Sequence, residues 1–109
     1  MTYTVMRQKT YTVEECVKIA SDLKMDGIDW VTTYGEDPAL LRKMSEDAGL
    51  AIAAYTFFIN PKEGEDVAGL AEKGMDIACE LGAPMVMIPT PALGSREESF
   101  KLWCERLAI

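Results

Sequence analysis

The feature of this sequence that most constrains its fold is a phrase that occurs three times, in which an amphipathic helix ends on a small residue and leads directly into a short apolar strand. The phrase occupies residues 24–31, 47–55 and 81–89. A helix that stops at glycine and continues as a strand is an αβ connection, and repeating it with one hand lays the strands parallel to each other. The sequence therefore predicts an α/β protein with a parallel sheet.

Four strands are expected to alternate with four helices. Apolar, β-branched and aromatic residues gather in the expected strands. These strands are residues 2–6, 27–31, 50–57 and 85–88. Each expected helix begins at a capping or turn signal and carries an apolar stripe at helical spacing. The caps are Thr12 with Glu15, Asp37 before Pro38, and Ser95 with Glu98, and the third helix follows a turn that ends before Val67 and stops at Gly82.

Two architectures fit this order of elements. The spacing between strand starts is close to the roughly 30 residues of one unit of an eight-unit barrel. Residues 1–109 are therefore expected to form a single (βα)4 unit, the N-terminal half of a TIM barrel. The alternative is an open, doubly wound, flavodoxin-like sheet with helices on both faces. The third strand ends in Tyr55, Thr56 and Phe57, without the aspartate that a response-regulator site of that fold needs.

Charge and hydropathy restrict the class of partner. Eighteen acidic and eleven basic residues give a net charge of −7, which opposes binding to nucleic acid and to anionic membrane surfaces. No stretch approaches the roughly 20 apolar residues that cross a bilayer. We therefore expect a cytoplasmic protein with no nucleic-acid or membrane partner.

Histidine and cysteine usage restricts the chemistry further. The sequence has no histidine, so a Ser-His-Asp, Cys-His or histidine-based zinc site cannot form within one copy of the chain. Its cysteines, Cys16, Cys79 and Cys104, fall one per expected helix without C-x-x-C spacing. This pattern favours reduced, buried thiols over disulfides or a zinc site.

Long stretches of the sequence resemble the xylose isomerase-like TIM barrels, the sugar phosphate isomerase/epimerase superfamily. The similar stretches are residues 11–20, 24–30, 40–54 and 71–91. The resemblance implies a divalent-metal-dependent isomerase or epimerase of carbohydrate metabolism, in which Mn, Mg, Co or Zn holds adjacent sugar oxygens. In that family the metal ligands come mostly from strands five to eight. The chain alone is therefore expected to bind no such metal and to be inactive until the barrel is complete.

Four residues are candidates for binding a sugar or sugar phosphate, because barrel sites lie at the carboxyl ends of the strands. Alternation in the second strand places Asp29 opposite Ile28, so Asp29 points into the barrel if Ile28 packs under the helices. The resemblance places Asp29 where the family usually has glutamate and Tyr55 where relatives often carry histidine. The other two candidates are Arg7, for a phosphate or carboxylate, and Thr90, a donor past the fourth strand.

Each candidate also has a structural interpretation. Asp29 could bond neighbouring backbone at a strand edge, Tyr55 could line a pocket without chemistry, and Arg7 could be a surface arginine. No catalytic residue is assigned. A half-barrel leaves its inner face and two sheet edges uncovered. We therefore expect either a homo-oligomer or a missing C-terminal half, and the alternative function is a non-catalytic small-molecule binding or assembly module.

Overall fold

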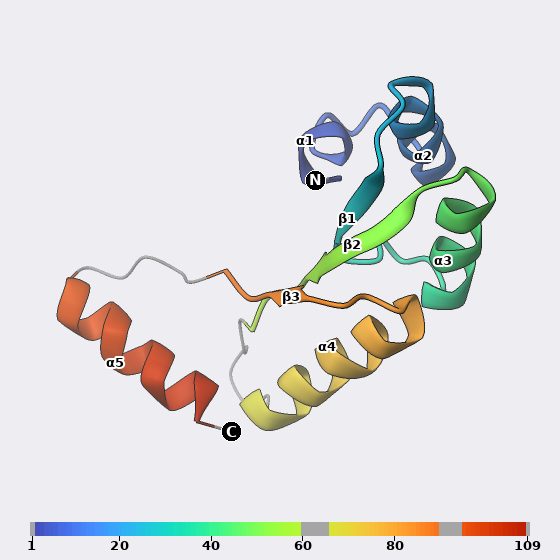
Figure 1. Cartoon of the computed structure of the whole chain (residues 1–109). Coiled ribbons are helices and arrows are strands. Elements are labelled where there is room, and N and C mark those ends of the chain that lie inside the picture. The colour runs from blue at the N-terminus through green and yellow to red at the C-terminus, as the bar shows by residue number, and fades with distance from the viewer. Residues whose placement is uncertain (1, 60–65, 90–94, 109) are drawn as a thin grey trace.

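The computed structural model describes residues 2–59, 66–89 and 95–108. Helices and short strands alternate in them, which makes the chain an α/β protein (Figure 1). The helices are α1 (Tyr3–Met6), α2 (Val13–Asp22), α3 (Pro38–Asp47), α4 (Val67–Leu81) and α5 (Arg96–Leu107). The strands are β1 (Gly27–Val31), β2 (Ala51–Thr56) and β3 (Val86–Met87).

The strands form one parallel sheet in the sequential order β1-β2-β3. A register shift after Ile28 pairs Asp29 with Ala54, and Val31 with Thr56. The expected strand 85–88 shrinks to the two residues of β3, which pair with Tyr55 and Thr56. Strand β3 is an edge of the described sheet, and both of its side chains are exposed, so little apolar burial supports a longer strand there.

The helices α2, α3 and α4 lie along one side of the sheet and contact each other in that order (Figure 1). Their apolar stripes meet the side chains of one sheet face in the hydrophobic core. Trp30, Leu41 and Leu81 are fully buried in this core, and Tyr55 of β2 joins them together with Phe57, which follows that strand. The core thus forms between one layer of helices and one face of a parallel sheet.

Local signals in the sequence set the helix ends. Helix α2 begins with a complete capping box between Thr12 and Glu15, and α5 begins with one between Ser95 and Glu98. The Asp37 side chain caps α3 by accepting from the backbone N–H of Ala39. Helix α4 ends at Gly82, whose φ of +71° is the left-handed conformation that glycine adopts without strain.

The prediction of a strand at residues 2–6 is wrong, because residues 3–6 form helix α1. The backbone N–H groups of Val5 and Met6 donate to the carbonyl of Thr2, so a helical turn begins immediately after Thr2. Strand propensity depends on neighbours that the residue packs against, and α1 contains no buried residue. The β-branched composition of this segment therefore does not decide its conformation.

Two other expectations need correction. Cys16 is buried, but Cys79 and Cys104 are exposed, although all three thiols are free. The expected apolar stripe of the last helix is not buried as a unit, because Phe100 is 70% exposed whereas Trp103 is 8% exposed. Among the described residues, none of the helices combines the length and hydropathy that a membrane span requires.

Candidate functional site at the carboxyl edge of the sheet

Asp29 and Thr56 lie together on the sheet face opposite the core. Asp29 alternates with the buried Ile28 and Trp30, so its side chain points away from the helices α2–α4. Thr56 is the register partner of Val31 on the neighbouring strand. Its hydroxyl donates to Oδ1 of Asp29 over 3.4 Å, and its own side chain is 2% exposed. The half-buried Asp29 carboxylate therefore keeps acceptor capacity for another hydroxyl group.

The loop after β1 brings further polar groups to the same edge through an unusual backbone. Thr32 and Tyr34 have φ angles of +62° and +52°, although neither is glycine. A β-branched residue at positive φ is strained, and such strain is commonly retained at functional sites. The backbone N–H of Thr32 donates to the carbonyl of Thr56 over 2.9 Å, which fixes the loop to the end of β2. The loop is therefore held in place by the strands it follows.

Tyr34 and Thr2 join this edge through their hydroxyl groups. The two hydroxyl oxygens lie 3.3 Å apart, and Thr2 Oγ1 also accepts the backbone N–H of Val31 over 2.9 Å. Tyr34 packs edge-on against Trp30, with ring centroids 6.5 Å apart. Burial raises the pKa of Tyr34, the negative charge of Asp29 adds to that increase, and the hydrogen bond with Thr2 opposes it. Tyr34 is thus a neutral hydroxyl donor or acceptor near Asp29.

The structure separates the other candidate residues from Asp29. Arg7 is exposed at the end of α1, with its guanidinium carbon 5.8 Å from the centroid of the Tyr3 ring. Tyr55 is 3% exposed in the core, where it stacks on Phe57 at 5.8 Å, and burial raises its pKa. Thr90 lies outside the described residues. Asp29 is therefore the one sequence candidate found in the cluster of Thr2, Tyr34 and Thr56, which we call the carboxyl-edge cluster.

The donors of this cluster do not fit a divalent metal by themselves. Mg and Mn prefer several carboxylate or carbonyl oxygens, and Zn needs three or four nitrogen, sulfur or carboxylate ligands. Asp29 is the single carboxylate in the cluster, and its neighbours are hydroxyl groups. In the described ranges, no three His, Cys, Asp or Glu side chains come together as a metal-binding group. The cluster can instead hydrogen-bond a polyhydroxylated ligand.

Comparison with known proteins adds no assignment: no protein-family model matches the chain, and neither a curated protein nor a solved structure matches it significantly. The fold and the cluster must therefore be interpreted from their own geometry.

Sequence reasoning missed Thr2, Tyr34 and Thr56 as members of the cluster. One usable signal was present, because the polar run 32–34 directly follows a predicted strand, where barrel loops carry function. The pairing of Thr2 with Tyr34 spans 32 residues, and no local pattern encodes it.

Proposed function

We propose that the chain is the first half of a xylose isomerase-like barrel that isomerises or epimerises a sugar or sugar phosphate, and that it is inactive alone. The observation that carries the proposal is the sequential strand order with α2, α3 and α4 on one face. A barrel is wound in this way, because every helix lies outside and every strand follows its predecessor.

The doubly wound alternative is less compatible with this arrangement. A flavodoxin-like sheet reverses its strand order at a switch point and covers both faces with helices. Here β1, β2 and β3 are consecutive neighbours, Thr2 bonds to the edge of β1, and α1, which follows it, contacts α2. The resemblance of residues 11–20, 24–30, 40–54 and 71–91 to the isomerase family supports the same choice.

In this proposal the carboxyl-edge cluster binds the sugar. Asp29 accepts hydrogen bonds from sugar hydroxyl groups, Thr56 orients its carboxylate, and the Tyr34 hydroxyl adds a polar contact. The metal ligands and the groups that move the proton come from the other half, because the cluster supplies only one carboxylate. No catalytic step is assigned to residues of this chain.

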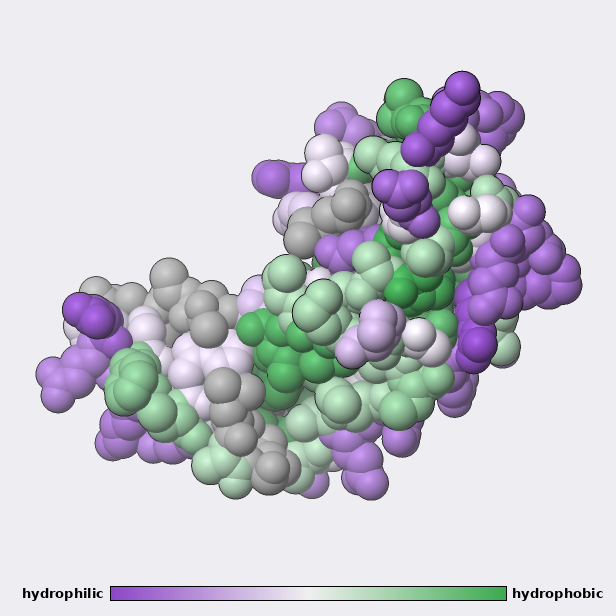
Figure 2. Space-filling view, viewed as in Figure 1, coloured by the Kyte–Doolittle hydropathy of each residue, from purple (hydrophilic) through white to green (hydrophobic). Residues whose placement is uncertain are grey.

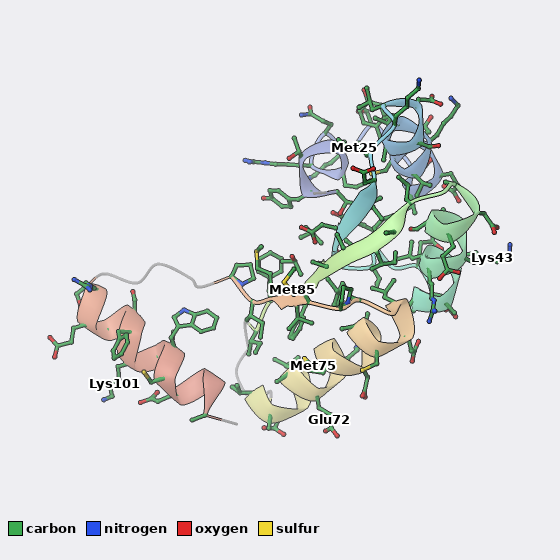
Figure 3. The ribbon with its side chains drawn as sticks, in the orientation of Figure 1. Met25, Lys43, Glu72, Met75, Met85 and Lys101 are labelled. Atoms are coloured by element: carbon green, nitrogen blue, oxygen red, sulfur yellow. The ribbon has the colours of Figure 1, made fainter. Side chains whose placement is uncertain are left out.

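The other half is either a second copy of the chain or a C-terminal half. Apolar side chains gather over the middle of the molecule around β3, whereas charged residues cover α3 (Figure 2). Met85 lies directly before β3 (Figure 3). It is 66% exposed, and Met87 and Phe58 are 45% and 43% exposed. An exposed apolar edge of this kind favours association.

The test is a nuclear magnetic resonance titration of the labelled chain with a panel of aldoses, ketoses and their phosphates, with and without Mg²⁺. We expect amide shifts to concentrate at Asp29, Thr32 and Thr56, and to disappear in Asp29→Asn. Aldose incubated with the isolated chain is expected to remain unconverted. Shifts centred on other elements, or turnover by the isolated chain, would contradict the proposal.

A second candidate is a non-catalytic binding or assembly module, which the hydroxyl-rich, single-carboxylate cluster favours. The two candidates differ in the assembled protein. Metal bound stoichiometrically by the oligomer or the completed barrel supports the isomerase, whereas sugar binding in an assembly without bound metal supports the module.

A further inference from the structure

An apolar groove runs along the free edge of β1, on the side away from β2. Its volume is about 100 Å³, and it lies between α2 and the first half of β1, with Thr2 and Val5 of α1 closing it at the end of the chain's first turn. The wall from α2 includes Cys16 and Ala20, and the floor includes Gly27 and Ile28. The exposed Leu23 and Met25 stand at its rim.

The backbone of β1 presents hydrogen-bonding groups to this groove. The carbonyl of Asp26 accepts from Ala51, and the N–H of Thr32 donates to Thr56, so even-numbered residues face β2. Backbone groups alternate along a parallel strand. The carbonyl of Gly27 and the N–H of Asp29 therefore face the groove. A residue of a parallel strand opposite Ile28 would use both groups.

One position along this edge is already filled in the manner of a parallel strand. The N–H of Thr2 donates to the carbonyl of Asp29 over 2.9 Å, and the N–H of Val31 donates to Thr2 Oγ1 over 2.9 Å. In a parallel ladder the residue opposite Trp30 makes these two bonds with its N–H and its carbonyl. Thr2 uses its hydroxyl in place of its carbonyl, because α1 takes the carbonyl. The edge thus holds one strand-like residue and continues into the groove.

We propose that the groove binds an extended apolar peptide, which lies parallel to β1 and leads into Thr2. Peptides that add a strand to a sheet edge combine backbone hydrogen bonds with pockets for alternate side chains. The residue opposite Ile28 shares the face of Ile28, so its side chain enters the groove against Cys16 and Ala20. A cavity of this size suits one branched aliphatic side chain, since a cavity of about 150 Å³ holds benzene.

Three observations identify the occupant as a peptide rather than a polar metabolite. The groove lining is largely aliphatic, the backbone edge offers one acceptor and one donor, and Thr2 fixes the direction of the strand. Burial also raises the pKa of the Cys16 thiol, as expected for a wall with little water. The groove shares Thr2 with the carboxyl-edge cluster. The inference uses only the hydrogen bonds of Thr2 to β1 and needs no sugar contact, so it does not depend on the proposed sugar function.

The test attaches the probe covalently, with Lys-Thr-Thr-Val joined ahead of Met1 so that valine falls opposite Ile28. The matched control carries Lys-Thr-Thr-Asp, which has the same length but places a charge in the groove. A second control carries proline in place of valine, because proline lacks the N–H that would donate to Gly27. All three are made with the exposed Cys79 and Cys104 replaced by serine.

In the valine variant we expect hydrogen exchange of the Asp29 amide to slow at least about tenfold relative to both controls. We also expect labelling of the Cys16 thiol by a small reagent to slow by about the same factor. Equal exchange and labelling in all three variants would overturn the proposal. The unextended chain could also dimerise with rising concentration, and any of the three extensions could abolish that dimer. This result would identify a second copy of the chain as the occupant of the groove and would also overturn the proposal.

Discussion

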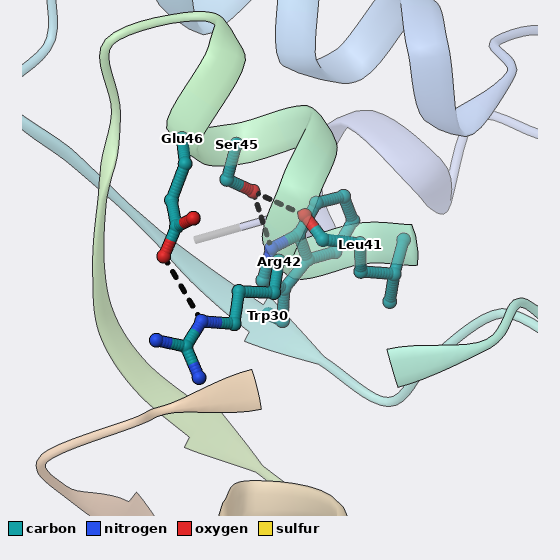
Figure 4. Close-up of polar contacts among 5 residues, drawn as sticks. All are labelled: Trp30, Leu41, Arg42, Ser45 and Glu46. Carbon is teal, nitrogen blue, oxygen red and sulfur yellow. Dashed lines mark hydrogen bonds and ion pairs between the residues drawn. The ribbon is translucent and has the colours of Figure 1, made fainter. Parts of the chain in front are cut away.

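The indole Nε1 of Trp30 donates a hydrogen bond to Ser45 Oγ over 3.1 Å across the core, from β1 to α3 (Figure 4). Ser45 in turn donates to the carbonyl of Leu41 over 2.8 Å, and all three residues are fully buried. The serine therefore satisfies the one polar atom of the largest core side chain, and it couples the sheet to α3.

Ser45→Ala is expected to lower the free energy of unfolding by about 1–3 kcal/mol, because it leaves the buried indole N–H without a partner. Urea denaturation followed by tryptophan fluorescence measures the change. The control is Lys43→Ala in the same helix, which breaks only the exposed ion pair with Asp47 and is expected to have a much smaller effect. An equal loss in both variants would show that α3, rather than the indole bond, sets the stability.

Thr2→Val is expected to destabilise the chain by about 1–3 kcal/mol, since it removes the acceptor of the buried Val31 N–H at nearly constant volume. Thr2→Ser keeps the hydroxyl and is expected to restore most of the loss. Denaturation midpoints of the two variants give the comparison. A serine variant no more stable than the valine variant would mean that the hydroxyl is not the stabilising group.

Gly74→Ala is expected to destabilise α4 against the sheet. A Cβ at Gly74 would lie 2.3 Å from the ring of Phe57, so the ring must move, and overpacking of this kind costs about 1–3 kcal/mol. The control is Gly69→Ala in the same helix, where the nearest atom is 3.4 Å away on Asp66. Because alanine favours helix, the control is expected to be neutral or to gain up to about 1 kcal/mol in thermal or urea denaturation.

Stability is expected to fall as the pH rises above about 10. Burial raises the folded-state pKa of Tyr34 and Tyr55, so folding favours their neutral forms. This contribution to stability is complete below the unfolded-state pKa near 10, and it is lost as the pH rises through the folded-state pKa. The raised pKa of Cys16 acts in the same direction from about pH 9. Urea denaturation between pH 8 and 11 should show a shallower decline in Tyr55→Phe. An unchanged slope would contradict burial of this hydroxyl.

Size-exclusion chromatography with light scattering tests the proposed association. We expect a mass above that of one chain at high concentration, and a lower mass when Met85 and Met87 are both replaced by lysine, because these exposed side chains lie directly before and within the edge strand β3. The matched control replaces Met75, which is exposed on α4, with lysine. A clean, well-folded monomer at all concentrations would count against a second copy as the other half.

Residues with local signals were predictable from the sequence. Thr12, Asp37 and Ser95 mark helix starts through bonds within three residues, and β1 falls at residues 27–31 as expected. Asp29 was placed on the correct face by alternation alone.

The sequence did not predict the parts of the structure that depend on distant partners. Residues 3–6 have strand-forming composition but form a helix. Thr2 accepts the Val31 N–H with its hydroxyl, so its carbonyl is available to accept the first hydrogen bonds of that helix. Thr32 and Tyr34 adopt positive φ angles although neither is glycine, so the sequence carries no signal of this loop conformation. Tyr55 was expected at a barrel mouth, but the side of β2 that it occupies depends on the register shift after Ile28.

The hydrogen bonds of Thr2 have a consequence for the tendency of the protein to aggregate. If an aminopeptidase trimmed the chain past this threonine, the Asp29 carbonyl and the Val31 amide would be uncovered together, and β1 would become an open template for strands of other molecules. Amino-terminal integrity would then decide between a dispersed protein and an aggregating one.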